Sequence, residues 1–278
     1  EYSKIMGKNR MTVFSRDILA SRERRLELME LLRESVERGF AGFSIQYQPQ
    51  VETLTGRLRG AEALARWHCA KYGDVSPGEF IPLMEQSGLI IPLGQWILRH
   101  AMVQCLEWSR LRPDFHISVN LSYIQLTQGD FISCLSAALK EINLAPSGLI
   151  MELTETYLAK AEEDTLRMIA QMKELGVKIA MDDFGVGYSS LFSLKNIPVD
   201  VVKIDKGFVK GITSDLFNAT FIRSITDLCH DVGRKVCLEG VETREEYEAV
   251  RELGMEYIQG FYFGRPMSAR QIEKTLKE

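Results

Sequence analysis

The sequence lacks several features that would quickly assign it to a class of protein. Its 278 residues carry a net charge of −4 with no block of like charges, which argues against a nucleic-acid polymer as partner and against direct membrane contact. The longest apolar runs, such as GLIIPLG at 88–94, fall far short of the roughly 20 residues that a membrane helix needs. No secretory signal is visible and the first residue is Glu1, so we expect an excised piece of a longer, cytoplasmic protein.

Cysteine and histidine are scarce and irregularly spaced. No CxxC pair occurs, which predicts reduced core thiols rather than disulfides or a zinc site, among the five cysteines Cys69, Cys105, Cys134, Cys229 and Cys237. No HxxxH or HxH pair occurs among the four histidines His68, His100, His116 and His230. These histidines are expected as packing or surface residues, so the ligands of any metal should be oxygens.

The chain divides into three segments. Residues 1–15 form a short unit with a turn at GKN and a strand-like MTVF. Residues 16–39 are predicted to form one helix, because Leu26, Met29, Leu32 and Val36 recur at helical spacing before Gly39 ends it. Residues 40–278 alternate between β-rich runs and helical stretches, and the whole chain has an ordinary globular composition of 45% hydrophobic and 26% charged residues.

This alternation predicts an α/β fold, a (β/α)₈ TIM-like barrel. The expected strands are 43–51, 58–67, 115–122, 148–155, 177–184, 199–205, 235–242 and 257–263. The first two are joined by ETLTG, which is too short for a crossover helix, so an irregular, antiparallel first strand is expected. An open doubly wound sheet is the alternative, and the absence of GxGxxG after the first strand weakens it.

Polar residues recur at the ends of these strands. They are Gln48, Glu62, Asn120, Glu152, Asp182, Asp183, Lys203, Glu239 and Gln259. In a parallel barrel the carboxyl ends of the strands meet at one face, where catalytic groups lie. Each residue alone could be a helix cap, a surface group or half of an ion pair. Together, so many acids need cations, and oxygen ligands with adjacent carboxylates favour two Mg²⁺ or Mn²⁺ ions, as in phosphoryl hydrolysis.

A second chemistry fits the same pattern. A strand that carries a lysine, among acids at successive strand ends, also describes enolase-like barrels, in which a lysine abstracts a proton beside Mg²⁺. The spacing of the residues does not separate the two possibilities.

The motifs also resemble a known family. EALARW at 62–67 looks like the signature of the EAL domain, the cyclic di-GMP phosphodiesterase family. Further motifs follow in the family's order: YQP, SPGEFIPLMEQSGLI, NLS, ELTE, DDFGVGYSSL, VKID, EGVET and QGFYFGRPM. The resemblance covers roughly residues 40–275. It implies hydrolysis of cyclic di-GMP to linear pGpG by a water that two cations activate.

The resemblance implies a role for each site residue. It implies metal ligands at Glu62, Asn120, Glu152, Asp182, Asp183 and Glu239, with two ions, Mg²⁺ or Mn²⁺. It implies a catalytic role for Glu62, Lys203, Glu239 and Gln259, with Lys203 contacting the attacking water. It implies substrate contacts from Gln48, Leu64, Arg66, Asp183 and Glu242, with Arg66 on a phosphate. Glu155 matches a glutamate that holds the loop after Asp183.

One position departs from the family pattern, and one segment extends the resemblance. Val186 stands where the family commonly has threonine, which could affect activity or its regulation, so a weak or inactive cyclic di-GMP receptor is the alternative function. Residues 1–15 resemble the end of a GGDEF (diguanylate cyclase) domain, the alternative being an ordinary polar tail. We therefore expect an upstream GGDEF domain, a linker helix at 16–39, and a homodimer that forms through the region after Asp183.

Overall fold

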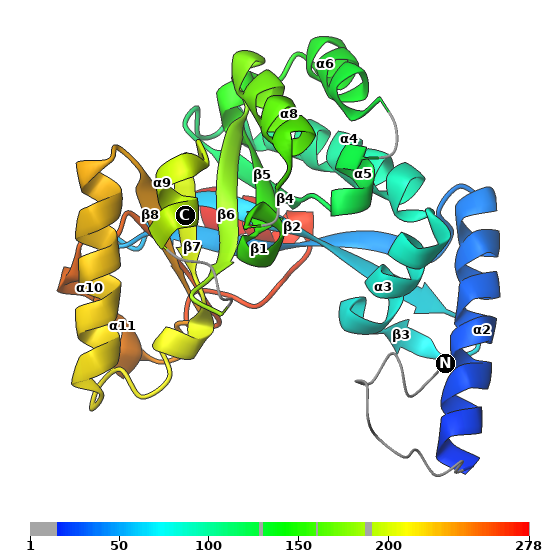
Figure 1. The fold of residues 1–278 in the computed structure, drawn as a ribbon, viewed down its shortest axis with the longest axis horizontal. Helices are drawn as coiled ribbons and strands as arrows, with labels where there is room; N and C mark the ends of the chain where they lie inside the picture. Colours follow the sequence, from blue (N-terminus) through cyan, green and yellow to red (C-terminus); the bar gives the residue numbers. More distant parts are fainter. Residues whose placement is uncertain (1–15, 128–129, 160, 187–190, 278) are drawn as a thin grey trace.

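The structure, a computed structural model, describes residues 16–127, 130–159, 161–186 and 191–277 (Figure 1). The strands are β1 (Phe43–Glu52), β2 (Leu58–Cys69), β3 (Gly73–Val75), β4 (His116–Asn120), β5 (Leu149–Thr154), β6 (Lys178–Phe184), β7 (Val201–Ile204), β8 (Lys235–Glu239) and β9 (Tyr257–Gln259). The α-helices are α2 (Arg16–Glu37), α3 (Pro77–Ser87), α4 (Ile90–Ser109), α5 (Tyr123–Thr127), α6 (Phe131–Ile142), α7 (Glu155–Leu158), α8 (Glu163–Glu174), α9 (Leu191–Asn196), α10 (Leu216–Asp231), α11 (Arg244–Val250) and α12 (Ala269–Lys277). Short 3₁₀ turns are η1 (Pro146–Gly148), η2 (Lys206–Phe208) and η3 (Arg251–Leu253). The segment that resembles a GGDEF end, 1–15, lies outside the described residues.

Eight strands close into a barrel. The order is β1-β9-β8-β7-β6-β5-β4-β2, and β1 closes the ring by pairing with β2. From β2 through β4 to β9 the neighbours are parallel, whereas β1 is antiparallel to both β2 and β9. Both the predicted barrel and its antiparallel first strand are confirmed.

The last strand is shorter than predicted. The sequence suggested 257–263, but β9 ends at Gln259 and the chain turns, with the N–H of Phe263 donating to the carbonyl of Gly260. A Cβ at Gly260 would lie 2.0 Å from the carbonyl oxygen of Val241, so this close approach of two chain segments requires glycine. The three-residue strand β3, which pairs with the far end of β2, was not predicted.

Helix α2 packs beside the barrel rather than on it. It lies against α3 and the protruding end of the β1–β2 hairpin (Figure 1). The helix was predicted, but one residue of its apolar face was wrong: Leu26 is 56% exposed, whereas Leu28 and Leu32 are buried. The buried face of the helix includes Ser35, whose Oγ accepts a hydrogen bond from Nε1 of Trp67. Because this residue is polar, the spacing of hydrophobic residues alone misplaced the buried face.

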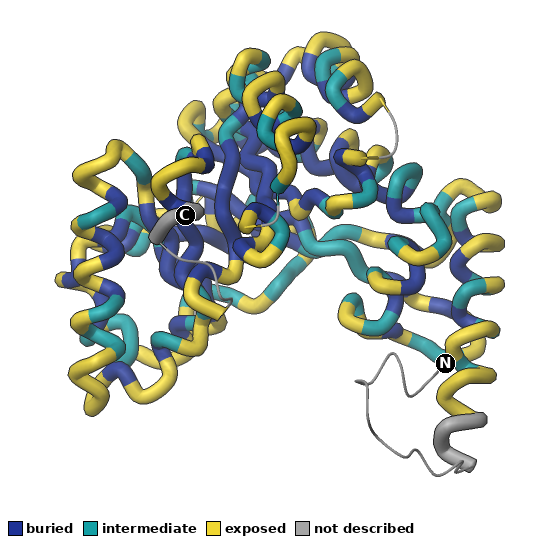
Figure 2. The backbone as a smooth tube through the Cα atoms, viewed as in Figure 1, coloured by how far each residue is buried: buried dark blue, intermediate teal, exposed yellow. Residues whose placement is uncertain are grey.

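The buried residues gather around the barrel and under its helices (Figure 2). Four cysteines belong to this interior as predicted, while Cys134 is exposed, because the apolar face of α6 is made by Phe131, Leu135 and Leu139 instead. Within the described ranges, no helix combines the length and apolar character needed to cross a membrane.

Candidate active site

The interior of the barrel is built from alternate residues of each strand. Side chains two residues apart share one face of a strand, so each strand points at least two side chains into the barrel. The first of the two is called the lower member here, and the second, nearer the carboxyl end of the strand, is called the upper member. The lower members include Ile150, Ala180, Val201 and Cys237, which pack together as a small apolar cluster. The upper members, toward the carboxyl ends, are Glu152, Asp182, Lys203 and Glu239. Strand geometry thus gathers charged groups on top of an apolar plug.

Lys203 stands at the centre of this charged layer. Its side chain is 1% exposed, and its ammonium group pairs with four carboxylates. The Nζ atom lies 2.8 Å from both Glu152 Oε2 and Glu239 Oε1, 3.1 Å from Asp182 Oδ1 and 3.4 Å from Glu62 Oε2. One cation does not balance four acidic side chains, so the layer still attracts further positive charge.

Two amide side chains fix the carboxylate of Glu62. Asn120 Nδ2 donates to its Oε1 at 2.6 Å, and Gln259 Nε2 donates to its Oε2 at 2.6 Å. Asn120 is exposed at the mouth, whereas Gln259 is buried. The carboxylate is therefore held in one orientation before any ligand arrives.

Behind Gln259 lie two residues that the sequence analysis did not single out. Gln50 Nε2 donates to Gln259 Oε1 at 2.8 Å, and Gln50 Oε1 pairs with Nε2 of buried His116 at 3.0 Å. A hydrogen-bonded chain thus runs from His116 through Gln50 and Gln259 to Glu62. Polar residues two apart on one strand were the available signal, since Gln48 precedes Gln50 and His116 precedes Ser118 and Asn120.

Burial and charge oppose each other in setting the pKa values. Burial lowers the pKa of Lys203, but the surrounding carboxylates raise it well above its usual range. Burial raises the pKa of Glu62, yet Lys203 and the two amide donors bring it below the ordinary value. For Glu239, burial outweighs the help of Lys203 and, with the charges of Asp182 and Glu62, raises its pKa to about 8.

The neutral, buried His116 makes folding stability sensitive to acid. Burial and the nearby charges of Lys178 and Lys235 lower its pKa from 6.5 to about 3. A depressed pKa means that its contribution is complete above pH 6.5 and is lost as the pH falls toward 3. The amide of His116→Gln can still donate to Gln50 but does not titrate. When the pH falls from about 7.5 to about 4.5, we therefore expect the unfolding free energy of the unmutated chain to drop by roughly 2 kcal/mol more than that of the variant.

Urea unfolding at both pH values checks this expectation. His100→Gln is the matched control, because it makes the same exchange at an exposed histidine. Equal acid sensitivity of the two variants would show that His116 titrates normally.

The turn after β6 is held in an unusual conformation. Asp183 has a φ of 55°, in the left-handed region that only a few non-glycine residues adopt. Two residues further on, Gly185 has a φ of 98°, and a Cβ there would lie 2.4 Å from the ring of Phe208. Glu155 Oε2 accepts a hydrogen bond from the Gly185 N–H at 2.9 Å, as expected for a residue that holds this loop. Gly187 and Tyr188 lie outside the described residues.

The donor set fits divalent cations. Oxygen atoms of Asp182, Asp183 and Glu239 lie within 4.8 Å of one another and could hold a metal. In addition, Glu152 Oε1 is buried and finds no hydrogen-bond partner among the residues that the structure describes, although a buried carboxylate oxygen is costly to leave unpaired. Carboxylate and amide oxygens at the carboxyl ends of the strands suit Mg²⁺ or Mn²⁺ better than Zn²⁺.

The residues predicted to contact substrate differ in how they are placed relative to this cluster. Leu64 and Arg66 follow Glu62 at two-residue steps on β2, so the three side chains share one face. Gln48 is directly opposite Glu62 across the β1–β2 pair. Arg66 is half-buried, and its Nε donates to Gln46 Oε1 at 2.9 Å. Glu242 is exposed after β8, and within the described parts of the chain no hydrogen bond or ion pair joins its side chain to the cluster.

Comparison with known families matches this architecture to one of them. The model of the EAL domain matches residues 29–266. The chain belongs to the EAL domain family. Its barrel with an antiparallel first strand and the acidic layer at the carboxyl ends of the strands are therefore features of an EAL domain.

Curated relatives and solved structures agree with this assignment. MucR of Pseudomonas aeruginosa, a bifunctional diguanylate cyclase/cyclic di-GMP phosphodiesterase, is 36% identical over 272 residues, which cover 98% of this chain and 39% of MucR. The cyclic di-GMP phosphodiesterase PdeR of Escherichia coli is 35% identical over 84% of this chain and 35% of its own length. The structure described as PaMucR phosphodiesterase in complex with c-di-GMP has a TM-score of 0.81 and 38% identity, covering 88% of this chain and 99% of that one. The chain thus spans little more than a third of the length of these curated relatives.

Proposed function

We propose that this EAL domain hydrolyses one phosphodiester bond of cyclic di-GMP, giving linear pGpG, and that it uses two divalent cations, Mg²⁺ or Mn²⁺. The observation that carries the proposal is the acidic layer around Lys203, with its remaining negative charge and the unpaired oxygen of Glu152. The relatives named as cyclic di-GMP phosphodiesterases support the choice of substrate.

Each side chain has a physical reason for its proposed role. Glu62, Asn120, Glu152, Asp182, Asp183 and Glu239 would hold the cations. The cations, when bound, would lower the pKa of the attacking water and offset phosphate charge. Lys203 and Gln259 would orient that water, since both are themselves fixed by several hydrogen bonds. Arg66 would donate to a nonbridging phosphate oxygen, and Gln48 and Leu64 would line the nucleotide site.

The geometry favours hydrolysis over the enolase-like alternative. A lysine that abstracts a proton must lose its own proton near neutral pH, which requires a lowered pKa. Lys203 is instead surrounded by four carboxylates that raise its pKa well above the usual range. In the metal-free site Lys203 therefore holds its proton, which favours a role in orienting water over that of a general base.

The test is incubation of the purified chain with cyclic di-GMP and Mg²⁺ or Mn²⁺, followed by chromatographic separation of nucleotides. Appearance of pGpG, and its loss when a chelator removes the metal, is the expected result. Saturable binding of cyclic di-GMP without product would instead make the domain a receptor. In that case Val186, which is 66% exposed beside the site loop, would be the first residue to change to threonine.

Gln50 is expected to act as a positioning residue for this reaction. Gln50→Leu removes the donor that holds Gln259 and leaves Gln259 free to rotate away from Glu62. Residues that orient metal-site groups from behind typically change metal affinity or activity about 10- to 100-fold. We expect kcat to fall by about tenfold with KM for cyclic di-GMP nearly unchanged, because Gln50 does not reach the substrate face.

Steady-state kinetics at saturating metal measures this effect. Gln50→Glu is the conservative comparison, because one carboxylate oxygen can still accept from His116 but the donor to Gln259 is gone. Full activity in both variants would assign Gln50 a purely structural role.

Two wider features stay proposals. An upstream GGDEF domain is proposed because MucR, named as a diguanylate cyclase as well as a phosphodiesterase, is much longer than this chain. A homodimer through the region after Asp183 is proposed from the family resemblance, and part of that region lies outside the described residues. Light scattering of this chain tests the second of these proposals.

A further inference from the structure

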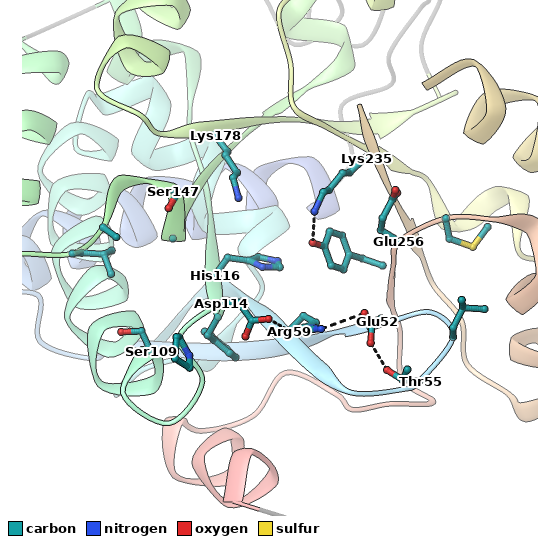
Figure 3. Close-up of a pocket in the computed structure, with 18 of the residues that line it drawn as sticks. Glu52, Thr55, Arg59, Ser109, Asp114, His116, Ser147, Lys178, Lys235 and Glu256 are labelled. Atoms are coloured by element: carbon teal, nitrogen blue, oxygen red, sulfur yellow. Dashed lines mark hydrogen bonds and ion pairs between the residues drawn. The ribbon is translucent and has the colours of Figure 1, made fainter. Parts of the chain in front are cut away.

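A pocket lies at the end of the barrel opposite to the acidic layer (Figure 3). It has a volume of about 810 Å³ and is lined by residues from the starts of β4, β6, β8 and β9, together with the β1–β2 hairpin. In most barrels of this type the amino-terminal face serves stability, whereas catalysis occurs at the other face. A pocket large enough for a small ligand is therefore unexpected here, since pockets of roughly 300–1,000 Å³ accommodate such molecules.

Strand alternation brings two lysines into this pocket. Lys178 lies four residues before Asp182 on β6, and Lys235 lies four residues before Glu239 on β8. Each lysine thus shares the inward face of its strand with a residue of the acidic layer, about 13 Å further along. The barrel interior has an acidic end and a lysine-bearing end, which the apolar plug around Val201 separates.

The two ammonium groups point into the same space. In Figure 3 the side chains of Lys178 and Lys235 converge above the ring of His116. Lys235 Nζ donates to the hydroxyl of Tyr257 at 3.1 Å, and Lys178 is half-buried. Lys235 is exposed, and among the described residues neither lysine forms an ion pair with a carboxylate; Asp200, whose charge acts on Lys178, is itself paired with Lys173.

The acids that line the pocket have other partners. Glu52 and Asp114 both pair with Arg59, on the far side of His116 from the lysines (Figure 3). Glu256 pairs with His230 at 3.1 Å and accepts the backbone N–H of Val236 at 2.9 Å. These acids are therefore not placed to neutralise the lysine pair.

The pKa values of groups in the pocket reflect the positive charge of the two lysines. Burial and then the charge of Lys235 lower the pKa of Lys178, and the opposing charge of Asp200 offsets only part of this. Burial, followed by the charges of Lys178, Lys235 and Arg59, lowers the pKa of His116 to about 3. An anion between the two lysines would relieve this repulsion with charge-assisted hydrogen bonds.

We propose that this pocket binds a small organic phosphate, with its phosphate group between Lys178 and Lys235. The hydroxyl of Ser147 is a further donor on the same side of the pocket (Figure 3). The remaining volume is lined in part by Leu54, Pro113 and Met255, which suit the organic portion of the ligand. The site is separate from the acidic layer and does not depend on the proposed hydrolysis.

Isothermal titration of the metal-free chain at low ionic strength tests the proposal. The probes are inorganic phosphate and AMP, which share the phosphate but differ in the organic group. We expect AMP to bind more tightly than phosphate, and Lys178→Gln/Lys235→Gln to weaken AMP binding at least about tenfold. The matched control Lys140→Gln/Lys210→Gln removes the same charge from two exposed lysines outside the pocket and should change binding less than about twofold.

The remaining variant and outcomes decide the proposal. Lys178→Arg/Lys235→Arg keeps both charges and should retain binding, which separates loss of charge from loss of fold. No binding of either probe at millimolar concentration, or equal weakening by the two glutamine double variants, would overturn the site. Binding of phosphate with no gain for AMP would overturn its assignment to an organic phosphate. Because no cyclic di-GMP or metal is present, these results are independent of whether the domain is a phosphodiesterase.

Discussion

Replacing Glu62 by glutamine is expected to abolish cyclic di-GMP hydrolysis, with a fall in kcat of about 10³-fold or more. The carboxylate is proposed to hold a cation, and an amide in its place supplies neither the charge nor the second acceptor oxygen. Metal affinity should fall together with turnover.

The same change should leave the fold intact. Gln259 can still donate to the amide oxygen of the new side chain, because Gln50 fixes Gln259 in its present orientation. The amide nitrogen then faces Asn120, which lies exposed at the mouth and can rotate to present its own oxygen. Few substitutions in this layer allow such a simple exchange of hydrogen bonds.

Chromatographic assay of pGpG, together with thermal unfolding, measures both expectations. Glu141→Gln is the control, since Glu141 is an exposed carboxylate of α6 that pairs with Arg99. Substantial pGpG production by the Glu62→Gln chain would show that hydrolysis does not use the acidic layer. A collapse in unfolding temperature would mean that Glu62 is needed for the fold as well.

Much of the fold could be predicted because the barrel follows local rules. Alternation of β-rich and helical runs specifies a parallel barrel, and the short link between the first two strands specifies the antiparallel pair. The end of β9 could not be placed in this way. Its limit is set by the contact of Gly260 with Val241, two residues that are close in space but separated along the chain.

The candidate site could be predicted in part for a similar reason. Polar residues at strand ends meet at one face, so Glu62, Glu152 and Asp182 could be grouped from their positions alone. The strand-end acids alone predict that all of the compensating charge comes from metal, whereas the structure places Lys203 among the carboxylates. Which strand's side chain reaches the centre depends on barrel stagger, and that is a property of the closed sheet.

The residues that support the site are harder to find. Gln50 and His116 carry no motif of their own, and their hydrogen bond joins strands 66 residues apart in the sequence. Lys178 and Lys235 look like ordinary surface lysines at the starts of strands. Only the closure of the barrel shows that they face its interior.

The central position of Lys203 predicts a second large effect, this time on stability. Lys203→Met retains most of the side-chain volume but leaves four carboxylates without their shared cation. Removing one partner of a buried ion pair typically costs about 3–5 kcal/mol. We expect the metal-free variant to lose about that much unfolding free energy, and to lose hydrolytic activity.

Divalent cations should reverse part of this loss in stability. A cation bound only by the folded state adds about 2.7 kcal/mol at a concentration one hundred times its dissociation constant. The acidic layer of the variant has one positive charge fewer than that of the unmutated chain, so Mg²⁺ should stabilise it more. Urea unfolding with Mg²⁺ and with chelator gives the stabilisation by Mg²⁺ for the variant and for the unmutated chain.

A double-mutant cycle separates charge from packing in this effect. Glu152 is the most buried partner of Lys203, and burial raises its pKa well above the usual range. Lys203→Met/Glu152→Gln should therefore be more stable than Lys203→Met alone, because glutamine needs neither the burial of an unpaired charge nor the uptake of a proton on folding. Lys173→Met is the control: its pair with Asp200 is partly exposed, so its loss should cost less than about 1 kcal/mol and show no dependence on Mg²⁺. If Glu152→Gln brought no recovery and Mg²⁺ acted equally on all the variants, Lys203 would be stabilising the barrel by packing alone.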